Sequence, residues 1–151
     1  MNDILDLLKT KLEGLVTGLT FDDQTNPGTP VGVTVHKLFL PVRSDSHQEG
    51  EEQPFLLIRR HRFVADVKPD RITIQVTGSI YTAGDYSDGD DDISRLCEAV
   101  MKITGSRGMN PYRLSTPADG WFGEKESGAQ AHPYYEFTLN LTFIAPSGRR
   151  I

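Results

Sequence analysis

Apolar and polar residues alternate without a break from Tyr135 to Phe143. Side chains on a β-strand point to opposite faces with a period of two, so this alternation predicts a strand with one buried face and one wet face. The residues expected on the buried face are Tyr135, Phe137, Leu139, Leu141 and Phe143. Pro133 and Pro146 bracket the segment, and neither can donate a hydrogen bond to a neighbouring strand.

Further strands are predicted upstream at Val31 to Leu40, Pro54 to about Val64, Arg71 to Tyr81 and, as a short candidate, Tyr112 to Leu114. Within Arg71 to Tyr81 we expect Ile72, Ile74, Val76, Gly78 and Ile80 to point inward, and Arg71, Thr73, Gln75, Thr77 and Ser79 outward. The turn-like link Lys68-Pro69-Asp70 predicts that this strand pairs antiparallel with the one before it. Asp22 to Pro30 is expected to be a loop, as is the Gly- and Ala-rich segment Pro117 to Ala131.

Two segments carry the period of an amphipathic helix. The first, Met1 to about Leu19, is expected to end at Gly18 and to pack on the protein's own sheet, although a membrane anchor or a partner helix has the same pattern. The second is expected to be capped by Asp90 or Asp91 and stopped by Gly105. Its apolar stripe comprises Ile93, Leu96, Cys97, Val100, Met101 and Ile103.

The order helix, strands, helix, strands predicts an α+β fold. We expect a mostly antiparallel β-sheet with the N-terminal helix and the second helix packed on it. The length of 151 residues favours a single domain spanning 1–151.

Composition narrows the functional classes. A net charge of −5 argues against a general nucleic-acid binder, which usually carries a basic excess. The single cysteine excludes an internal disulfide framework. No apolar run approaches the roughly 18 residues of a membrane span, and acidic residues interrupt the N-terminal helix, unlike a signal peptide. We therefore expect a soluble protein, made in a reducing cytoplasm, with no membrane partner.

Candidate chemistry is sparse. The four histidines are scattered and no pair has metal-ligand spacing, although a site assembled in three dimensions stays open. The aspartates between Asp85 and Asp92 loosely resemble a calcium loop, but the closing Glu of an EF-hand is missing, and helix capping is the favoured interpretation. Cys97 is expected to be a core residue rather than a nucleophile. We predict no enzyme, no cofactor and no metal.

Two surface features are candidates for contacts with partners. In the basic run Arg59-Arg60-His61-Arg62, a strand places Arg60 and Arg62 on one face and Arg59 on the other. Ion pairing with the acidic loop residues Glu49, Glu51 and Glu52, or with another subunit, is favoured over nucleic-acid contact. Trp121 and Phe122, between Gly120 and Gly123, are either an interface anchor or docked on the protein's own core. The acidic loop residues Asp85 and Asp88 complete the set of interface candidates.

Several short motifs follow one another along the chain in an order that resembles that of a known protein family. They are Pro54-Phe55-Leu56-Leu57-Ile58-Arg59, the alternating strand to Ile80, the loop Gly84-Asp85-Tyr86-Ser87-Asp88, the helix Asp91 to Thr104, and a strand from Pro133-Tyr134-Tyr135 to Ala145-Pro146. This layout resembles the tail terminator (tail completion) proteins of long-tailed bacteriophages and prophages. Each motif is short, and the resemblance depends on their order along nearly the whole chain.

The resemblance implies a non-enzymatic virion protein that forms a homohexameric ring on the head-proximal end of the tail tube. Such a ring stops tube polymerisation and presents a surface to the neck or head-completion protein, while DNA only passes through its lumen. Before assembly the subunit would reside in the host cytoplasm. We expect charge reversal at Arg60 or Arg62 to weaken assembly without unfolding the subunit. Two alternatives stay open: a neck or head-closure protein of the same virion module, and a small metal-dependent hydrolase using His36, His61 and the aspartates.

Overall fold

The computed structural model describes residues 4–26, 28–38, 40, 53–60, 71–105, 109, 111–125 and 127–144. Its elements are α1 (Ile4–Leu15), β1 (Thr20–Asp22), β2 (Pro30–Gly32), β3 (Thr34–Lys37), β4 (Phe55–Arg60), β5 (Arg71–Tyr81), α2 (Tyr86–Met101), the 3₁₀ turn η1 (Lys102–Gly105), β6 (Arg113–Phe122) and β7 (Tyr134–Ile144). The predicted α+β class, with both helices, is confirmed.

The main sheet has five strands in the order β3-β4-β5-β7-β6. Only the β3–β4 pair is parallel among these neighbours; β4–β5, β5–β7 and β7–β6 are antiparallel. The antiparallel pairing expected for β4 and β5 is confirmed, with Phe55 opposite Ser79 and Arg60 opposite Ile74. The two longest strands, β5 and β7, lie side by side along their full 11 residues. They form the centre of the sheet on which the rest of the molecule is built.

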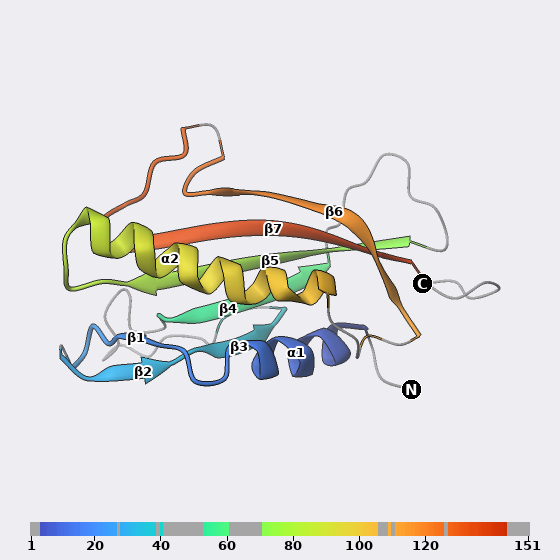
Figure 1. Cartoon of the computed structure of the whole chain (residues 1–151), viewed down its shortest axis with the longest axis horizontal. Coiled ribbons are helices and arrows are strands. Elements are labelled where there is room, and N and C mark those ends of the chain that lie inside the picture. The colour runs from blue at the N-terminus through green and yellow to red at the C-terminus, as the bar shows by residue number, and fades with distance from the viewer. Residues whose placement is uncertain are drawn as a thin grey trace.

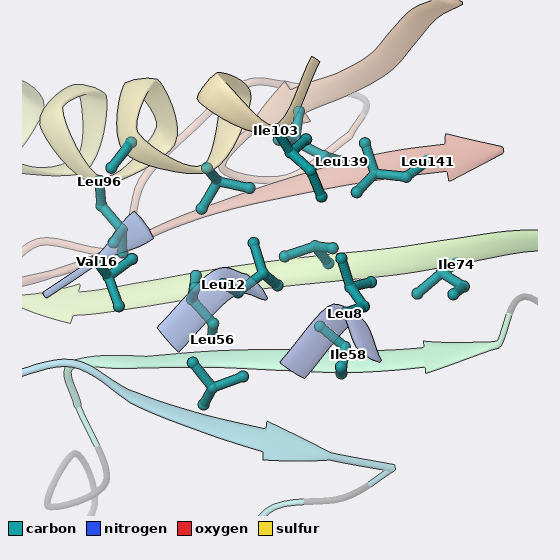
Figure 2. Close-up of a cluster of buried hydrophobic side chains, with 14 of the residues drawn as sticks. Leu8, Leu12, Val16, Leu56, Ile58, Ile74, Leu96, Ile103, Leu139 and Leu141 are labelled. Atoms are coloured by element: carbon teal, nitrogen blue, oxygen red, sulfur yellow. The ribbon is translucent and has the colours of Figure 1, made fainter. Parts of the chain in front are cut away.

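Both helices lie on the same side of this sheet (Figure 1). Helix α1 packs on β3 and β4, and α2 packs on β5 and β7. The core fills the space between the two layers, and Figure 2 shows side chains of α1, α2, β4, β5 and β7 gathered there. Its labelled members are Leu8, Leu12, Val16, Leu56, Ile58, Ile74, Leu96, Ile103, Leu139 and Leu141, all of them buried. Burying one such side chain contributes about 1.5–3 kcal/mol, so this interface is what makes the N-terminal helix part of the domain.

The alternation in β5 and β7 is confirmed. Every residue predicted to face inward on the two strands is buried. Two of the residues expected on the wet face are nevertheless buried, because Ser79 is 5% exposed and Thr138 is 9% exposed. The Ser79 hydroxyl accepts a hydrogen bond from Gln53 Nε2 at 3.1 Å, so a neighbouring polar side chain covers it. The expectation that these two residues are exposed to solvent was therefore wrong.

Helix α1 is shorter than the predicted Met1 to Leu19 helix, because its regular turns end at Leu15. Gly18 adopts the left-handed φ of 86°, which only glycine takes without strain, and it ends the segment as expected. Ile4, Leu5, Leu8 and Leu12 are all buried against the sheet layer. The interpretation of this segment as a helix packed on its own domain is confirmed.

A small hairpin corrects the prediction for the next segment. Thr20–Asp22 forms β1, which pairs antiparallel with β2, so part of the expected loop is a strand. The predicted single strand from Val31 to Leu40 is instead divided into β2 and β3, which belong to different sheets. Val33 is the residue between them. The valine alternation runs through the break, and therefore it could not reveal that the pairing partner changes.

Two further boundaries were wrong. Helix α2 begins at Tyr86, well before the predicted cap at Asp90 or Asp91. The short strand predicted from Tyr112 to Leu114 continues as β6 to Phe122, into the first part of the predicted Gly- and Ala-rich loop. Pairing with β7 supports this extension, with a register shift between Ser115 and Asp119. Tertiary pairing thus overrides a composition that is typical of loops.

Candidate interaction surfaces

Asp85 and Asp88 start helix α2. The Asp85 side chain accepts a hydrogen bond from the Asp88 backbone N–H at 3.0 Å, and Asp88 Oδ2 accepts one from the Asp85 N–H at 3.1 Å. This reciprocal arrangement is a capping box, which satisfies two backbone donors and places negative charge at the positive end of the helix. Both residues keep exposed surface, but their carboxylates have a local structural role.

Arg59 and Arg60 point to opposite faces of the sheet, as successive residues of a strand must. Arg59 donates from Nε and Nη2 to Gln75 Oε1 at 3.4 and 3.3 Å, on the face away from the helices. Arg60 is exposed at the end of β4, opposite Ile74. The other predicted members of this basic and acidic group, Arg62, Glu49, Glu51 and Glu52, lie outside the described residues, as do His47 and His61.

The sheet face opposite the helices, here called the open face, carries no helix among the described residues (Figure 1). Its centre is a ladder of uncharged polar side chains. The hydroxyls of Thr73 and Thr142 lie 3.0 Å apart, and those of Thr77 and Thr138 lie 3.5 Å apart. Cross-strand pairs of this kind stabilise neighbouring strands, yet they leave lone pairs and protons available to a partner.

One row of the open face runs across four strands. Register places Arg59 opposite Gln75, Gln75 opposite Asn140, and Asn140 opposite Asp119. The row therefore has a cation at one end and an anion at the other, with two amides between them. Asn140 Oδ1 is buried and has no hydrogen-bond partner among the described residues. A buried acceptor without a partner costs free energy, so Asn140 is a locally unfavourable position in the centre of this row.

Trp121 lies on the open face and not in a loop. It sits in β6 opposite Thr138, is half-buried, and has Lys125 Nζ 4.9 Å from the centre of its ring. Its neighbour Phe122 points to the helix side, opposite Phe137. The expectation that the two aromatics lie in a loop was wrong, because they end strand β6, and a strand sends adjacent side chains to opposite faces.

Phe122 borders a groove on the helix side of the sheet. Helix α2 covers β5 and β7 but β6 lies beyond it, at the edge of the sheet. This edge groove has a volume of about 390 Å³ and is lined by Ser94, Cys97, Glu98, Met101, Lys102 and Phe122. Phe122 remains 42% exposed although its ring contacts Phe137. Cys97 and Met101, predicted to be core residues, are half-buried and form the apolar wall of the groove.

The thiol in this groove is poorly activated. Burial, and then the nearby Glu98 carboxylate, raise the pKa of Cys97 above its ordinary value. A thiol with a raised pKa holds less of the reactive thiolate at neutral pH.

The sequence pattern did not predict an aromatic cluster that lies at the start of α2. Tyr135 is fully buried, and its hydroxyl lies 2.8 Å from His132 Nδ1. Tyr86 stacks on the His132 ring at 4.5 Å, and it stays 62% exposed. Gly89 makes the cluster fit, because a Cβ there would overlap the Tyr135 ring. The one available signal was a glycine inside an acidic helical segment.

His36 lies in β3, with its ring centroid 6.4 Å from that of Phe55. Burial, and then the Lys9 charge, lower its pKa. Within the described ranges, no three His, Cys, Asp or Glu side chains gather closely enough to hold a metal ion. In the same part of the chain, no helix is long and apolar enough to cross a membrane.

Comparison with models of known protein families gives no match, and a search of curated proteins gives none either.

Proposed function

We propose that this chain is a non-enzymatic structural protein of a long-tailed bacteriophage or prophage. It caps the tail tube as a homohexameric ring, stops tube polymerisation and provides the surface to which the neck of the filled head attaches. Its partners are further copies of itself, the tail tube protein and a neck or head-completion protein. DNA only passes through the ring, and the protein needs no cofactor. It acts in the virion, after a period in the host cytoplasm.

The observation that carries this proposal is the open face. Helices cover one side of the five-stranded sheet, while the other side has a centre of Thr, Gln and Asn side chains. A sheet face that stays in water usually carries many charged residues, whereas the centre of a protein interface is depleted of them. The charged residues Arg59 and Asp119 lie on β4 and β6, the two strands that flank this polar centre. This distribution is that of an interface with a polar centre and a charged rim.

The size of the open face also supports an assembly role. Strands spaced about 4.8 Å apart and rising about 3.3 Å per residue give a five-stranded face of roughly 600–700 Å². Each partner in a standard stable interface contributes about 800 Å², so this face can supply most of one such contact. Its hydroxyl and amide groups exchange water for partner hydrogen bonds at small net cost.

The proposal is tested by polymerising the phage's purified tail tube protein with and without this chain. We expect tubes to stop growing and to carry a ring at one end when the protein is present. The variant Thr77→Lys puts a charge at the centre of the open face and should weaken capping. Thr29→Lys, an exposed threonine in the hairpin turn between β1 and β2, is the matched control and should cap normally. Tube lengths unaffected by correctly folded wild-type protein would contradict the proposal.

A further inference from the structure

Leu38 combines two unfavourable features at one residue. Its backbone is left-handed, with φ of 77°, and it is the one non-glycine residue with positive φ among the described residues. Its large apolar side chain is also 49% exposed. Left-handed backbone is strained for a bulky L-residue, and an exposed leucine forgoes the gain of burial. Strain of this kind persists where surrounding structure enforces it, and it is concentrated at functional positions.

The surrounding structure holds Leu38 in place. Its backbone N–H donates to the Ile58 carbonyl at 2.8 Å, which extends the parallel β3–β4 ladder by one residue. The preceding residue, Lys37, forms an ion pair with Asp6 of α1. Leu38 therefore projects from a fixed point at the end of the edge strand β3. A side chain on a fixed backbone position costs less conformational entropy on binding than one on a mobile segment.

The edge groove lies at the other side of the molecule. Strands β3 and β6 are the two outer strands of the five-stranded sheet, and Figure 1 shows them at its lower and upper borders. The groove's apolar wall consists of Cys97, Met101 and Phe122. Its volume of about 390 Å³ easily admits a leucine side chain, since a cavity of about 150 Å³ is enough for benzene. An apolar projection and an apolar recess thus occupy opposite edges of one subunit.

Between two copies of the protein, charge favours contact of the β3 edge with the groove edge over contact between two identical edges. Helix α2, which forms one wall of the groove, has five acidic side chains and one arginine. Helix α1 and strand β3 together have three lysines and two acidic side chains. Packing α2 against α2 of a second copy would oppose like charges, whereas the α1–β3 edge brings a small positive excess to α2. A head-to-tail contact between unlike surfaces can repeat around an axis and close a ring.

We infer that Leu38 of one copy inserts into the groove between α2 and β6 of a second copy, and that this contact links neighbouring subunits. The inference rests on the proposed ring, and it names the residues through which the ring forms. The occupant of the groove is a leucine side chain of the same protein.

The chain's single cysteine provides a direct test, because Cys97 lines the groove. Leu38→Cys should place a second thiol against Cys97 of the neighbouring copy. Oxidation with oxidised glutathione, at alkaline pH because the pKa of Cys97 is raised, should then give a ladder of covalent oligomers on a non-reducing gel. The double variant L38C/C97S and the variant Thr29→Cys, which carries its new thiol in the β1–β2 turn, should both give no ladder.

A second set of variants separates assembly from folding. Leu38→Gly relieves the backbone strain, so the isolated subunit should stay folded and melt no lower than wild type. Its association should nevertheless weaken by about tenfold to a hundredfold, the loss expected for one buried leucine. Leu38→Met keeps an apolar side chain of similar volume and should assemble with little loss. Native mass spectrometry over a concentration series measures all three proteins.

The outcomes distinguish the inference from the proposed function. If wild type forms rings while L38G assembles equally well and L38C gives no ladder, the Leu38 contact is wrong and the capping function stands. If L38C gives the ladder and L38G dissociates but tubes are not capped, the contact is right and the proposed function is wrong. A wild type that stays monomeric at its highest soluble concentration, with no ladder from L38C, overturns the inference.

Discussion

At the scale of single residues, Gly89 is a position where close packing leaves no room for a larger side chain. It lies in α2, where alanine is normally favoured over glycine by about 1 kcal/mol. An added Cβ would, however, overlap atoms Cε1 and Cζ of the fully buried Tyr135 ring. We expect Gly89→Ala to cost about 1–3 kcal/mol from overpacking, which outweighs the gain in helix propensity. Chemical denaturation with circular dichroism measures the change in the free energy of unfolding.

Gly14 in α1 is the matched control, because a Cβ there meets nothing within 4 Å. Gly14→Ala should therefore stabilise the protein by about 0.5–1 kcal/mol. If both alanine variants gave the same change, the close contact between α2 and Tyr135 would be wrong.

The capping box gives a second prediction at this scale. Asp85→Ala removes the acceptor for the Asp88 N–H and should destabilise the protein by about 0.5–2 kcal/mol. Asp85→Asn retains a side-chain oxygen and should remain close to wild type. Thermal melts of the two variants measure the difference. An N-cap at Asp90 or Asp91 instead would leave both melts unchanged.

Glu136 gives a prediction of pH dependence. Burial, and then the Glu124 carboxylate, raise its pKa above the ordinary value of 4.5. A carboxyl whose pKa is raised on folding opposes folding when it is ionised, so this contribution to stability is lost as the pH rises through the raised pKa. Glu136→Gln should stabilise the protein slightly at pH 7, by up to about 0.5 kcal/mol, because the carboxylate is only partly withdrawn from water and solvent screens most of the effect.

The gain from Glu136→Gln should shrink as the pH falls through the raised pKa and should be absent below 4.5, where the wild-type carboxyl is protonated in both states. Urea denaturation of the two proteins at several pH values provides the test. A gain that did not depend on pH would contradict this explanation.

At the scale of elements, the sequence predicts those whose pattern stays regular from end to end. β5 was predicted with its observed bounds and β7 to within a residue at each end, because alternating burial fixes both the period and the buried face. The predicted stripe includes the buried residues Ile93, Leu96 and Val100 of α2 and the buried Ile103 of η1. Where pairing or capping decides the element, the pattern was not enough. Strand β1 has only three residues, which is too few to show an alternation of apolar and polar positions. The start of α2 depends on Asp85 and Asp88, and aspartate is also typical of loops.

The two faces of β7 give a prediction for the whole strand. Leu141 is fully buried towards the helices, whereas Thr142 points to the open face and bonds Thr73 at 3.0 Å. Leu141→Ala should cost about 2–5 kcal/mol, as a cavity in the core does. Thr142→Ala should cost about 0.5–1.5 kcal/mol, the value of one hydrogen bond. Equal costs in denaturation experiments would mean that the open face is packed as a core.

At the scale of the whole molecule, the sequence identified some interface candidates but not the surfaces they belong to. Arg59 and Trp121 lie on the open face, and Phe122 borders the edge groove. Which of two adjacent aromatics meets which surface depends on the register of β6 on β7, and no local pattern encodes that register. The groove exists because α2 stops short of the last strand, and Leu38 becomes notable only through its backbone conformation.

The central claim is that this protein ends the tail tube, and electron microscopy of particles from the source phage with this gene disrupted tests it most directly. We expect overlong or irregular tails without heads, and their return to normal length when the wild-type gene is supplied in trans. Tails of normal length beside separate filled heads would instead indicate a neck or head-closure protein. Normal infectious particles would contradict the claim altogether.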